Sequence, residues 1–322
     1  MQGGGNLTCN SSAVSVRNLY QTAGTLNLPD ASGSFTVTGT GSGGGGDGYH
    51  IRLEGGTTTH NSGTVEITAA SATAVRINAA LYNLVLDSSG SGGAIQFIAT
   101  TRLYGDLTLE DDFDFYSYNN SGTYYALTVD GDVSIEGDNT LGRTEMNQNY
   151  SFGSLTIASG CTFIATSGTT TLATADTQRA GYGGQPSALE VISGGTFTHN
   201  NGTIKLTSIY DQDIEMDGTG TLYNLTFNKS DNDVIHTSSL VIENNLDVTL
   251  AAGHSLRPSS GSNTVTVYGN TYLTTGNIGD TTQYTGTNNW GLVTINSGEF
   301  ILSTGTNNVS GIRNVGGTVS QS

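Results

Sequence analysis

The carboxylates of segment 211–218 are the side chains best suited to chemistry in this sequence. The segment reads DQDIEMDG, so an extended strand places its acidic residues on one face and its apolar residues on the other. The acidic residues are Asp211, Asp213, Glu215 and Asp217. Oxygen ligands of this kind suit Ca²⁺, although the segment lacks the glycine and glutamate positions of an EF-hand loop. It therefore predicts a candidate Ca²⁺ site, with a solvated acidic strand face as the alternative interpretation.

Other patterns that could serve metal binding or catalysis have simpler interpretations. The segment GSGGGGDG at 41–48 resembles one unit of a calcium-binding repeat, but such units work in tandem rows, and the alternative is a flexible glycine loop. The histidines show no metal-ligand spacing, and His60 and His199 occupy equivalent turns of two repeated segments. No serine-hydrolase, zinc-protease or phosphate-loop motif is present. We therefore predict no catalytic residue and no required cofactor.

Polysaccharide cleavage stays open as an alternative activity. A glycosidase needs two carboxyl groups roughly 5–9 Å apart, a distance that a sequence does not reveal. A polysaccharide hydrolase or lyase is therefore the alternative to a protein without enzymatic activity.

Aromatic residues gather in polar loops. Segment 113–125 reads FDFYSYNNSGTYY, and Asn-rich loops that end in an aromatic residue recur at 147–152 and 284–290. Exposed tyrosine rings suit recognition of sugars or proteins. We expect these loops to project from one side of successive coils as a binding edge. The candidate binding residues are Tyr116, Tyr118, Tyr124, Tyr125, Tyr150, Tyr284 and Trp290. The alternative is that Phe113, Phe115 and some of the tyrosines fill the core at a bulge.

Composition and charge exclude several classes of protein. The 322 residues include 46 glycines but only 3 prolines, and 35% are hydrophobic, which favours a thin core wrapped by short strands. The net charge of −17 disfavours nucleic acid and anionic membranes as partners. No run of about 18 apolar residues predicts a membrane helix. The first residues do not resemble a signal peptide, so we expect either export without one or a piece of a longer chain.

An internal duplication organises the chain. Residues 81–87 read LYNLVLD and residues 222–228 read LYNLTFN, and further paired motifs keep the same order at nearly the same offset. We therefore divide one solenoid, 1–322, into consecutive parts. They are N-terminal coils with a glycine-rich attachment segment or cap (1–54), repeat A (55–169), a connecting coil with a loop (170–193), repeat B (194–306) and a C-terminal cap (307–322).

Short apolar–polar–apolar signatures recur within each repeat about every 22 residues. Such a period predicts an all-β fold, a right-handed parallel β-helix (β-solenoid) of about 14 coils, whereas an antiparallel sandwich is the alternative. The residues expected in its core are Tyr82, Leu84, Leu86, Tyr223, Leu225 and Phe227. Asn83 and Asn224 are then expected to point outward or to lie at a corner.

Three motifs resemble the repeats of β-helical surface proteins. They are LTVDGDVSIEG (127–137), LTIASGCTFIATSGTTTL (155–172) and VTINSGEFILSTGT (293–306). Similar repeats occur in bacterial adhesins and autotransporter passengers, and in the fibres, tailspikes and capsid-attached fibres of phages. The resemblance implies a right-handed parallel β-helix, often trimeric in the phage cases. It transfers no catalytic residue.

These observations lead to a functional hypothesis with two alternatives. We expect a non-enzymatic structural or attachment protein on the surface of a bacteriophage virion, a fibre or capsid decoration protein, assembled as a homotrimer. Its expected partners are its own copies and either other virion proteins or a host-surface glycan, without nucleic acid and without membrane insertion. The alternatives are a bacterial adhesin or filament subunit at the cell surface, and a polysaccharide-degrading tailspike.

Overall fold

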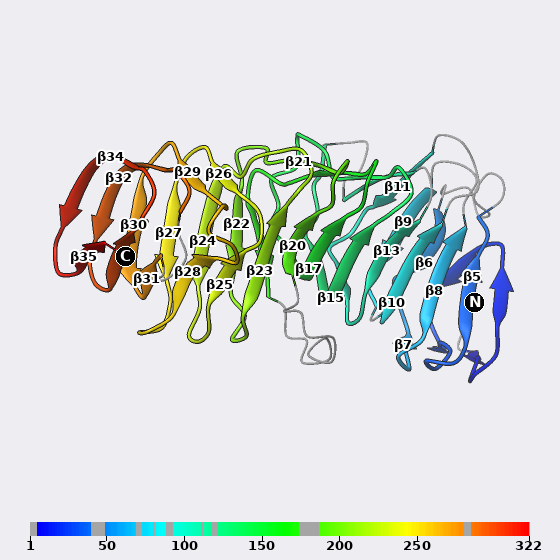
Figure 1. Ribbon diagram of the computed structural model, residues 1–322. Coiled ribbons are helices and arrows are strands. Elements are labelled where there is room, and N and C mark those ends of the chain that lie inside the picture. The colour runs from blue at the N-terminus through cyan, green and yellow to red at the C-terminus, as the bar shows by residue number, and fades with distance from the viewer. Residues whose placement is uncertain are drawn as a thin grey trace.

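The protein is an elongated parallel β-solenoid, described here from a computed structural model (Figure 1). The structure describes residues 5–39, 49–68, 73–79, 81–87, 93–110, 113–117, 122–173, 187–279 and 285–321. These residues form strands and turns without a helix, and the chain makes about 12 turns, close to the predicted 14. The all-β solenoid prediction is confirmed. Within the described ranges, no helix exists that could cross a membrane.

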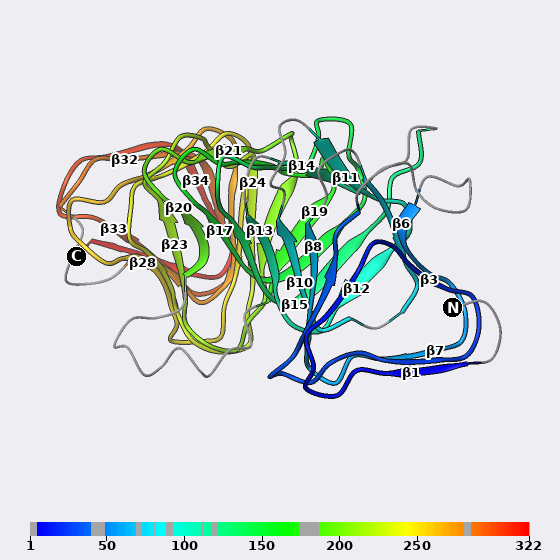
Figure 2. The same ribbon diagram turned by 90° about the vertical axis from the view of Figure 1, so that its right-hand side faces the viewer.

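The coils have three faces, which we name X, Y and Z in the order in which the chain passes through them (Figure 2). Face Y is a parallel ladder that runs almost the whole length of the molecule. Its strands are β2 (Val14–Val16), β5 (Ser34–Val37), β8 (Thr64–Thr68), β10 (Asn83–Asp87), β13 (Leu107–Glu110), the second halves of β15 (Leu127–Ile135) and β17 (Tyr150–Ile157), β20 (Ser187–Val191), β23 (Gln212–Met216), β25 (Val234–His236), β28 (Ser255–Pro258), β31 (Asn277–Ile278), β33 (Glu299–Leu302) and β35 (Thr318–Gln321).

Faces X and Z complete each coil. Face X contains β12 (Thr101–Leu103), the first halves of β15 and β17, β19 (Thr169–Leu172), β22 (Thr203–Leu206), β24 (Asn224–Asn228), β27 (Leu246–Thr249), β30 (Thr271–Thr275) and the second halves of β32 (Asn288–Ile295) and β34 (Asn307–Asn314). Face Z contains β3 (Leu19–Gln21), β6 (Tyr49–Leu53), β9 (Thr73–Ile77), β11 (Gly93–Phe97), β14 (Phe113–Tyr116), β16 (Thr140–Leu141), β18 (Thr162–Ile164), β21 (Thr196–Thr198), β26 (Leu240–Ile242), β29 (Val265–Val267) and the first halves of β32 and β34. The strands β1 (Asn6–Thr8), β4 (Thr25–Asn27) and β7 (Thr57–Thr59) form a separate sheet in the N-terminal coils.

The core is a column of apolar side chains inside the coils. On face Y, Leu84 pairs in register with Val65 of the preceding coil and Leu107 of the next, so identical positions stack on one another. The residues Leu84, Leu86, Leu225 and Phe227 are at most 2% exposed, as expected from the period-2 pattern. The strands therefore bury every second side chain, and the thin core matches the low apolar content.

The predicted positions of Tyr82 and Tyr223 are wrong. Both tyrosines are only half-buried, and the strands begin one residue later, at Asn83 and Asn224. The buried position before each strand belongs instead to Leu81 or Leu222. Turn dihedrals set the direction of a side chain at a corner, so the alternation of the strand does not extend backwards into it.

Asparagine side chains connect successive coils at the corners, as expected for Asn83 and Asn224. Asn83 Oδ1 accepts a hydrogen bond from the backbone N–H of Asp106 (2.9 Å). Asn224 Oδ1 accepts one from the backbone N–H of Asn245 (3.2 Å). These bonds satisfy backbone groups that the corner removes from the strand ladders.

Repeats A and B occupy different faces of the solenoid. Val65 and Leu84 belong to face Y, whereas their equivalents Ile204 and Leu225 belong to face X. The offset between the repeats, 204 − 65 = 139 residues, is therefore not a whole number of turns. The same local structure is built twice, but it is rotated by one face in the second copy.

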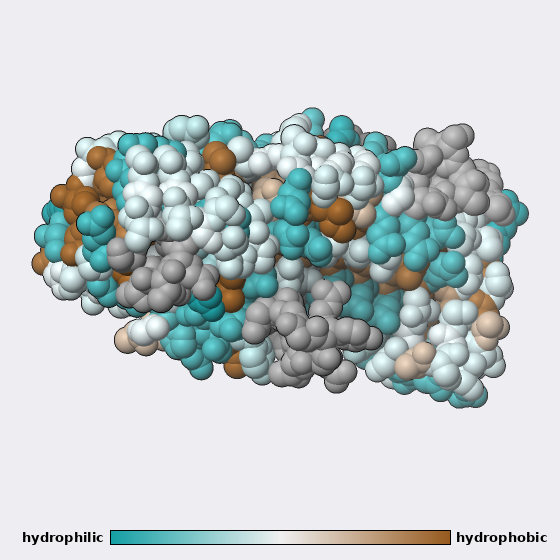
Figure 3. Space-filling view, viewed as in Figure 1, coloured by the Kyte–Doolittle hydropathy of each residue, from teal (hydrophilic) through white to brown (hydrophobic). Residues whose placement is uncertain are grey.

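Residues 307–321, predicted as a cap, contribute β34 and β35, which extend the ladders by a further coil. This coil leaves apolar side chains partly in solvent, and brown patches mark that end of the rod in Figure 3.

The two cysteines, Cys9 and Cys161, are buried and unpaired, and burial raises the pKa of both thiols.

Candidate binding site

The predicted aromatic binding residues divide into buried and partly buried groups. Tyr150 and Trp290 are 1% and 5% exposed, so their prediction as projecting contact residues is wrong. Tyr150 donates its hydroxyl to Met146 Sδ (3.1 Å), and burial raises the pKa of this phenol. Both residues lie in long strands, at positions whose side chains point into the core.

The remaining candidates lie at a corner or outside the described residues. Tyr116, Tyr124 and Tyr125 are half-buried, and the first two pack against the core. The Arg143 guanidinium lies 4.8 Å from the centre of the Tyr116 ring. These rings therefore offer less free surface than a projecting loop would. Tyr118 and Tyr284 lie outside the described residues.

The three aromatic loops do not share one edge, contrary to our expectation. Segments 117–126 and 142–149 both connect face Z to face X, because each lies between a Z strand and an X strand. Segment 279–287 connects face Y to face Z, since it follows β31 and leads into β32. The rotation of repeat B by one face explains the difference.

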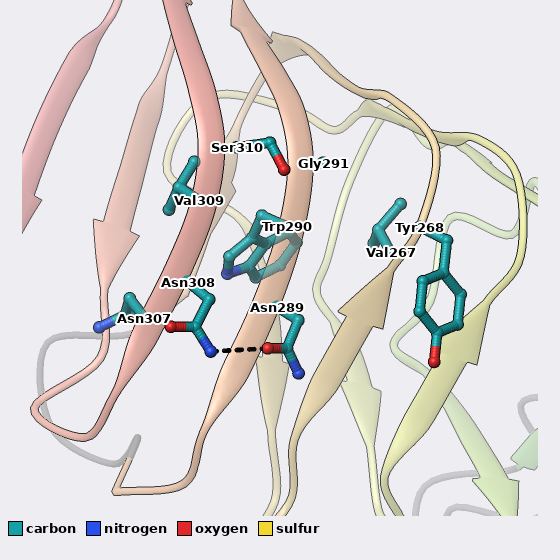
Figure 4. Close-up of a pocket in the computed structure, with 9 residues that line it drawn as sticks. All are labelled: Val267, Tyr268, Asn289, Trp290, Gly291, Asn307, Asn308, Val309 and Ser310. Atoms are coloured by element: carbon teal, nitrogen blue, oxygen red, sulfur yellow. Dashed lines mark hydrogen bonds between the residues drawn. The ribbon is translucent and has the colours of Figure 1, made fainter.

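The structure contains a hollow at the corner between faces Z and X, near the C-terminal end, which we call the Tyr268 hollow (Figure 4). Its volume is about 540 Å³, within the range of small-molecule sites. It is lined by Val267, Tyr268, Asn289, Trp290, Gly291, Asn307, Asn308, Val309 and Ser310. These residues come from three successive coils, through β29 with the residue after it, β32 and β34.

A glycine lines the hollow at its narrowest backbone approach. The register of β29, β32 and β34 places Gly291, which is itself buried, between the positions of Tyr268 and Ser310. A Cβ atom at position 291 would collide with the carbonyl oxygen of Gly269. The tight corner therefore requires glycine here, because the backbone of the preceding coil already occupies the place of a side chain.

Amide side chains and a buried indole shape the floor and rim. Asn308 Nδ2 donates to Asn289 Oδ1 (2.8 Å), and Asn289 Nδ2 donates to Thr266 Oγ1 (3.1 Å). This chain of hydrogen bonds fixes the amides in one orientation. Trp290 packs edge-to-face on Phe300, with ring centroids 5.2 Å apart, so its ring is held by the core while it borders the hollow.

Tyr268 is the main exposed group of the hollow. Its side chain is 72% exposed, the largest fraction among the large apolar and aromatic residues in the described ranges. Exposure of an aromatic ring keeps apolar surface in water, which is unfavourable in free energy. The face of the exposed ring is available for stacking against a ligand. Sequence comparison of the repeats could have identified this residue, because it replaces Asp130 at the equivalent position before a corner glycine.

The acidic strand β23 does not form a converging metal site. Asp211 Oδ1 accepts the backbone N–H of Asp233 (2.8 Å) and so belongs to a corner ladder. Asp213 lies partly buried with one carboxyl oxygen, Oδ1, that has no hydrogen-bond partner. Burial, followed by the nearby charge of Asp211, raises the pKa of Asp213 to about 6. Burial likewise raises the pKa of Glu215.

Lys229 compensates part of this negative charge from a buried position at the neighbouring corner. Its Nζ donates to the carbonyl oxygens of Tyr210 and Asp233 (3.2 Å to Asp233) and to Gln212 Oε1 (3.3 Å). Burial lowers the pKa of Lys229 to about 8. Within the described ranges, no group of three or more His, Cys, Asp or Glu side chains is arranged to hold a metal ion. Ca²⁺ binding at 211–217 stays a prediction without a built site.

Two equivalent corners carry histidine–tyrosine stacks that the sequence did not indicate. His60 stacks on Tyr82 with centroids 5.3 Å apart, and His199 stacks on Tyr223 at 5.4 Å. Each histidine accepts a backbone N–H on Nδ1, which is the shared turn role expected from the repeat. The proton of each neutral imidazole therefore lies on Nε2.

Comparisons with protein-family models, with curated proteins and with solved structures find no match to this chain.

Proposed function

We propose that the protein is a non-enzymatic attachment rod that binds a surface through the Tyr268 hollow. The observation that carries this proposal is an aromatic side chain, 72% exposed, beside a preformed hollow with oriented amides. A stacked solenoid supports it mechanically, because each coil holds its neighbours in register. The proposed setting is the surface of a bacteriophage virion, with the chain acting as a fibre or decoration protein.

Multivalent attachment fits the proposed homotrimeric assembly. One hollow on each subunit would let several weak contacts engage the same surface, and avidity multiplies their strength. Light scattering at micromolar concentration tests the assembly, and a monodisperse monomer would contradict it.

Attachment can be tested with labelled protein on a panel of bacterial strains, with the bound fraction measured by flow cytometry. Tyr268→Ala should abolish most of the binding, because the exposed ring is lost. Tyr210→Ala is the matched control, because this tyrosine is 37% exposed on another part of the rod. Equal binding by both variants would contradict the assignment of attachment to the hollow.

The virion setting needs a separate measurement. Mass spectrometry of purified phage particles, produced by the genome that encodes this chain, should detect the protein. Its detection in a bacterial cell-surface fraction instead would favour the alternative of an adhesin or filament subunit.

Polysaccharide cleavage is the second candidate, and the carboxylates of face Y favour it. Glu190 and Glu215 are register partners on adjacent strands, where backbones lie about 4.8 Å apart. The pKa of Glu215 is raised by burial and then by Asp217 and Glu190, as suits a proton donor. New reducing ends after incubation with capsular polysaccharide, absent for Glu215→Gln, would support this activity over simple binding.

A further inference from the structure

We infer that the Tyr268 hollow takes an uncharged oligosaccharide, laid across successive coils. This inference rests on the proposed function and names the ligand class of the same site. Every described residue that lines the hollow is uncharged, and the polar side-chain groups present are amides, a hydroxyl, a phenol and an indole N–H. A carboxylated or sulfated glycan would find no cation there, and the net charge of −17 would repel it at longer range.

The polar groups match a ligand rich in hydroxyls. Asn289 and Asn308 are fixed by their mutual hydrogen bond, which leaves Asn308 Oδ1 available as an acceptor. Ser310 Oγ and the Tyr268 hydroxyl likewise have no partner among the described residues, and each can both donate and accept. A sugar hydroxyl has the same double capacity. Because the amides are already oriented, binding loses little side-chain entropy there.

The exposed ring supplies the apolar part of the contact. The face of an aromatic ring is electronegative, and the C–H groups on one face of a pyranose are slightly positive. Tyr268 and Gly291 both line the hollow, so a sugar ring stacked on the phenol can extend over the exposed polar groups of the next coils. A second contact of this kind is not needed, because the amides hold the next sugar unit.

The shape of the hollow favours an oligomer. Its residues come from three successive strands, so it extends over two inter-strand steps, or roughly 10 Å along the rod. A single monosaccharide would contact only part of this length. A protein partner fits less well, because interface hot spots are clusters of apolar anchors and this site has one exposed ring with a polar rim.

The single tryptophan of the chain makes the inference directly measurable. Trp290 is the only tryptophan and borders the hollow, so its fluorescence reports on the site alone. The neutral probes are cellohexaose, maltohexaose, mannohexaose and xylohexaose, and the acidic probes are oligogalacturonate and a sulfated dextran oligomer. A neutral probe should change the emission saturably. Tyr268→Ala should weaken that binding about tenfold, whereas Tyr210→Ala should leave it unchanged. Circular dichroism verifies that both variants are folded.

The outcomes separate this inference from the proposed function. A saturable change with neutral probes that is lost in Tyr268→Ala supports the inference. A change with acidic probes only overturns the ligand class. If no glycan changes the emission while Tyr268→Ala still loses attachment to cells, the inference fails and the proposed function stands. If attachment to cells does not depend on Tyr268, the proposed function fails regardless of the titration.

Discussion

The corner glycine is shared by repeats A and B, but the side chains beside it differ. In repeat A, Asp130 precedes Gly131 and is held by Arg102, whose Nη2 lies 2.8 Å from Asp130 Oδ2. In repeat B, Tyr268 precedes Gly269, and the residue equivalent to Arg102 is Val241. Repeat A therefore presents an ion pair at this corner, whereas repeat B presents a neutral aromatic ring beside a hollow. Duplication kept the backbone and changed the surface chemistry.

A second pair of corners shows the same division. His60 stacks on Tyr104 with centroids 5.5 Å apart, and Tyr104 is 44% exposed. At the equivalent position of repeat B, Glu243 places Oε2 3.2 Å from His199 Nε2. The turn that holds each histidine is conserved between the repeats, so only the outer partner was free to vary.

The largest expected effect concerns the two equivalent core leucines. Leu84→Ala on face Y and Leu225→Ala on face X should each lower the free energy of unfolding by about 2–5 kcal/mol, because both side chains are fully buried between neighbouring coils. Urea unfolding followed by circular dichroism measures the loss. A near-neutral result for one of them would mean that the repeats are not packed equivalently.

Next in size is Gly291, which lies one coil after Gly269 and packs against it. Gly291→Ala should destabilise the protein by about 1–3 kcal/mol, because the added Cβ meets the carbonyl of Gly269 and the backbone must move. Thermal unfolding gives the comparison with Gly311→Ala, whose Cβ would only approach the flexible Leu292 side chain at 3.3 Å. Equal melting temperatures for the two variants would refute the close backbone packing at Gly291, beside the hollow.

The acidic strand provides an intermediate effect that depends on pH. Repeat B reads QDIEM at β23, where repeat A has TAVRI at β9. The pKa of Asp213 rises from its ordinary value of 3.8 to about 6 in the folded protein. Between these values the folded protein binds a proton that the unfolded chain has lost, so stability falls as the pH rises from about 4 to 6.

Asp213→Asn should remove this loss. The variant should melt at a higher temperature than the parent at pH 7, and the difference should shrink toward pH 4. Asp217→Asn, at an exposed position of the same segment, is the control. If the melting temperatures of the two variants depend on pH in the same way over this range, burial of Asp213 does not affect the stability of the protein.

The smallest effect is expected at the histidine corners. Glu243→Tyr copies the arrangement of repeat A into repeat B, and Tyr104→Glu does the reverse. Both positions are more than 40% exposed, so each exchange should change stability by about 1 kcal/mol or less. Differential scanning calorimetry measures the change. A loss of several kcal/mol would show that the corners are not interchangeable.

The sequence by itself determined the fold class, the period and most of the core. Alternation along a strand is a local property, and register stacking repeats it from coil to coil, so Leu84 and Leu225 could be assigned without a structure. The duplication also made Asn83 and Asn224 identifiable as equivalent corner residues. Alternation within the long strands β17 and β32 was missed, because the loops before Tyr150 and Trp290 obscured where each strand begins.

Only the tertiary structure decided which face each repeat occupies and where the hollow lies. Corner lengths vary from coil to coil, and their sum over 139 residues sets the rotation between the copies, which no single motif contains. The hollow joins Tyr268, Gly291 and Ser310, which are neighbours only through the register of successive coils. The direction of a side chain at a corner depends on the turn dihedrals, and the contacts between successive coils depend on the register accumulated along the chain. Both are therefore fixed only in the folded solenoid.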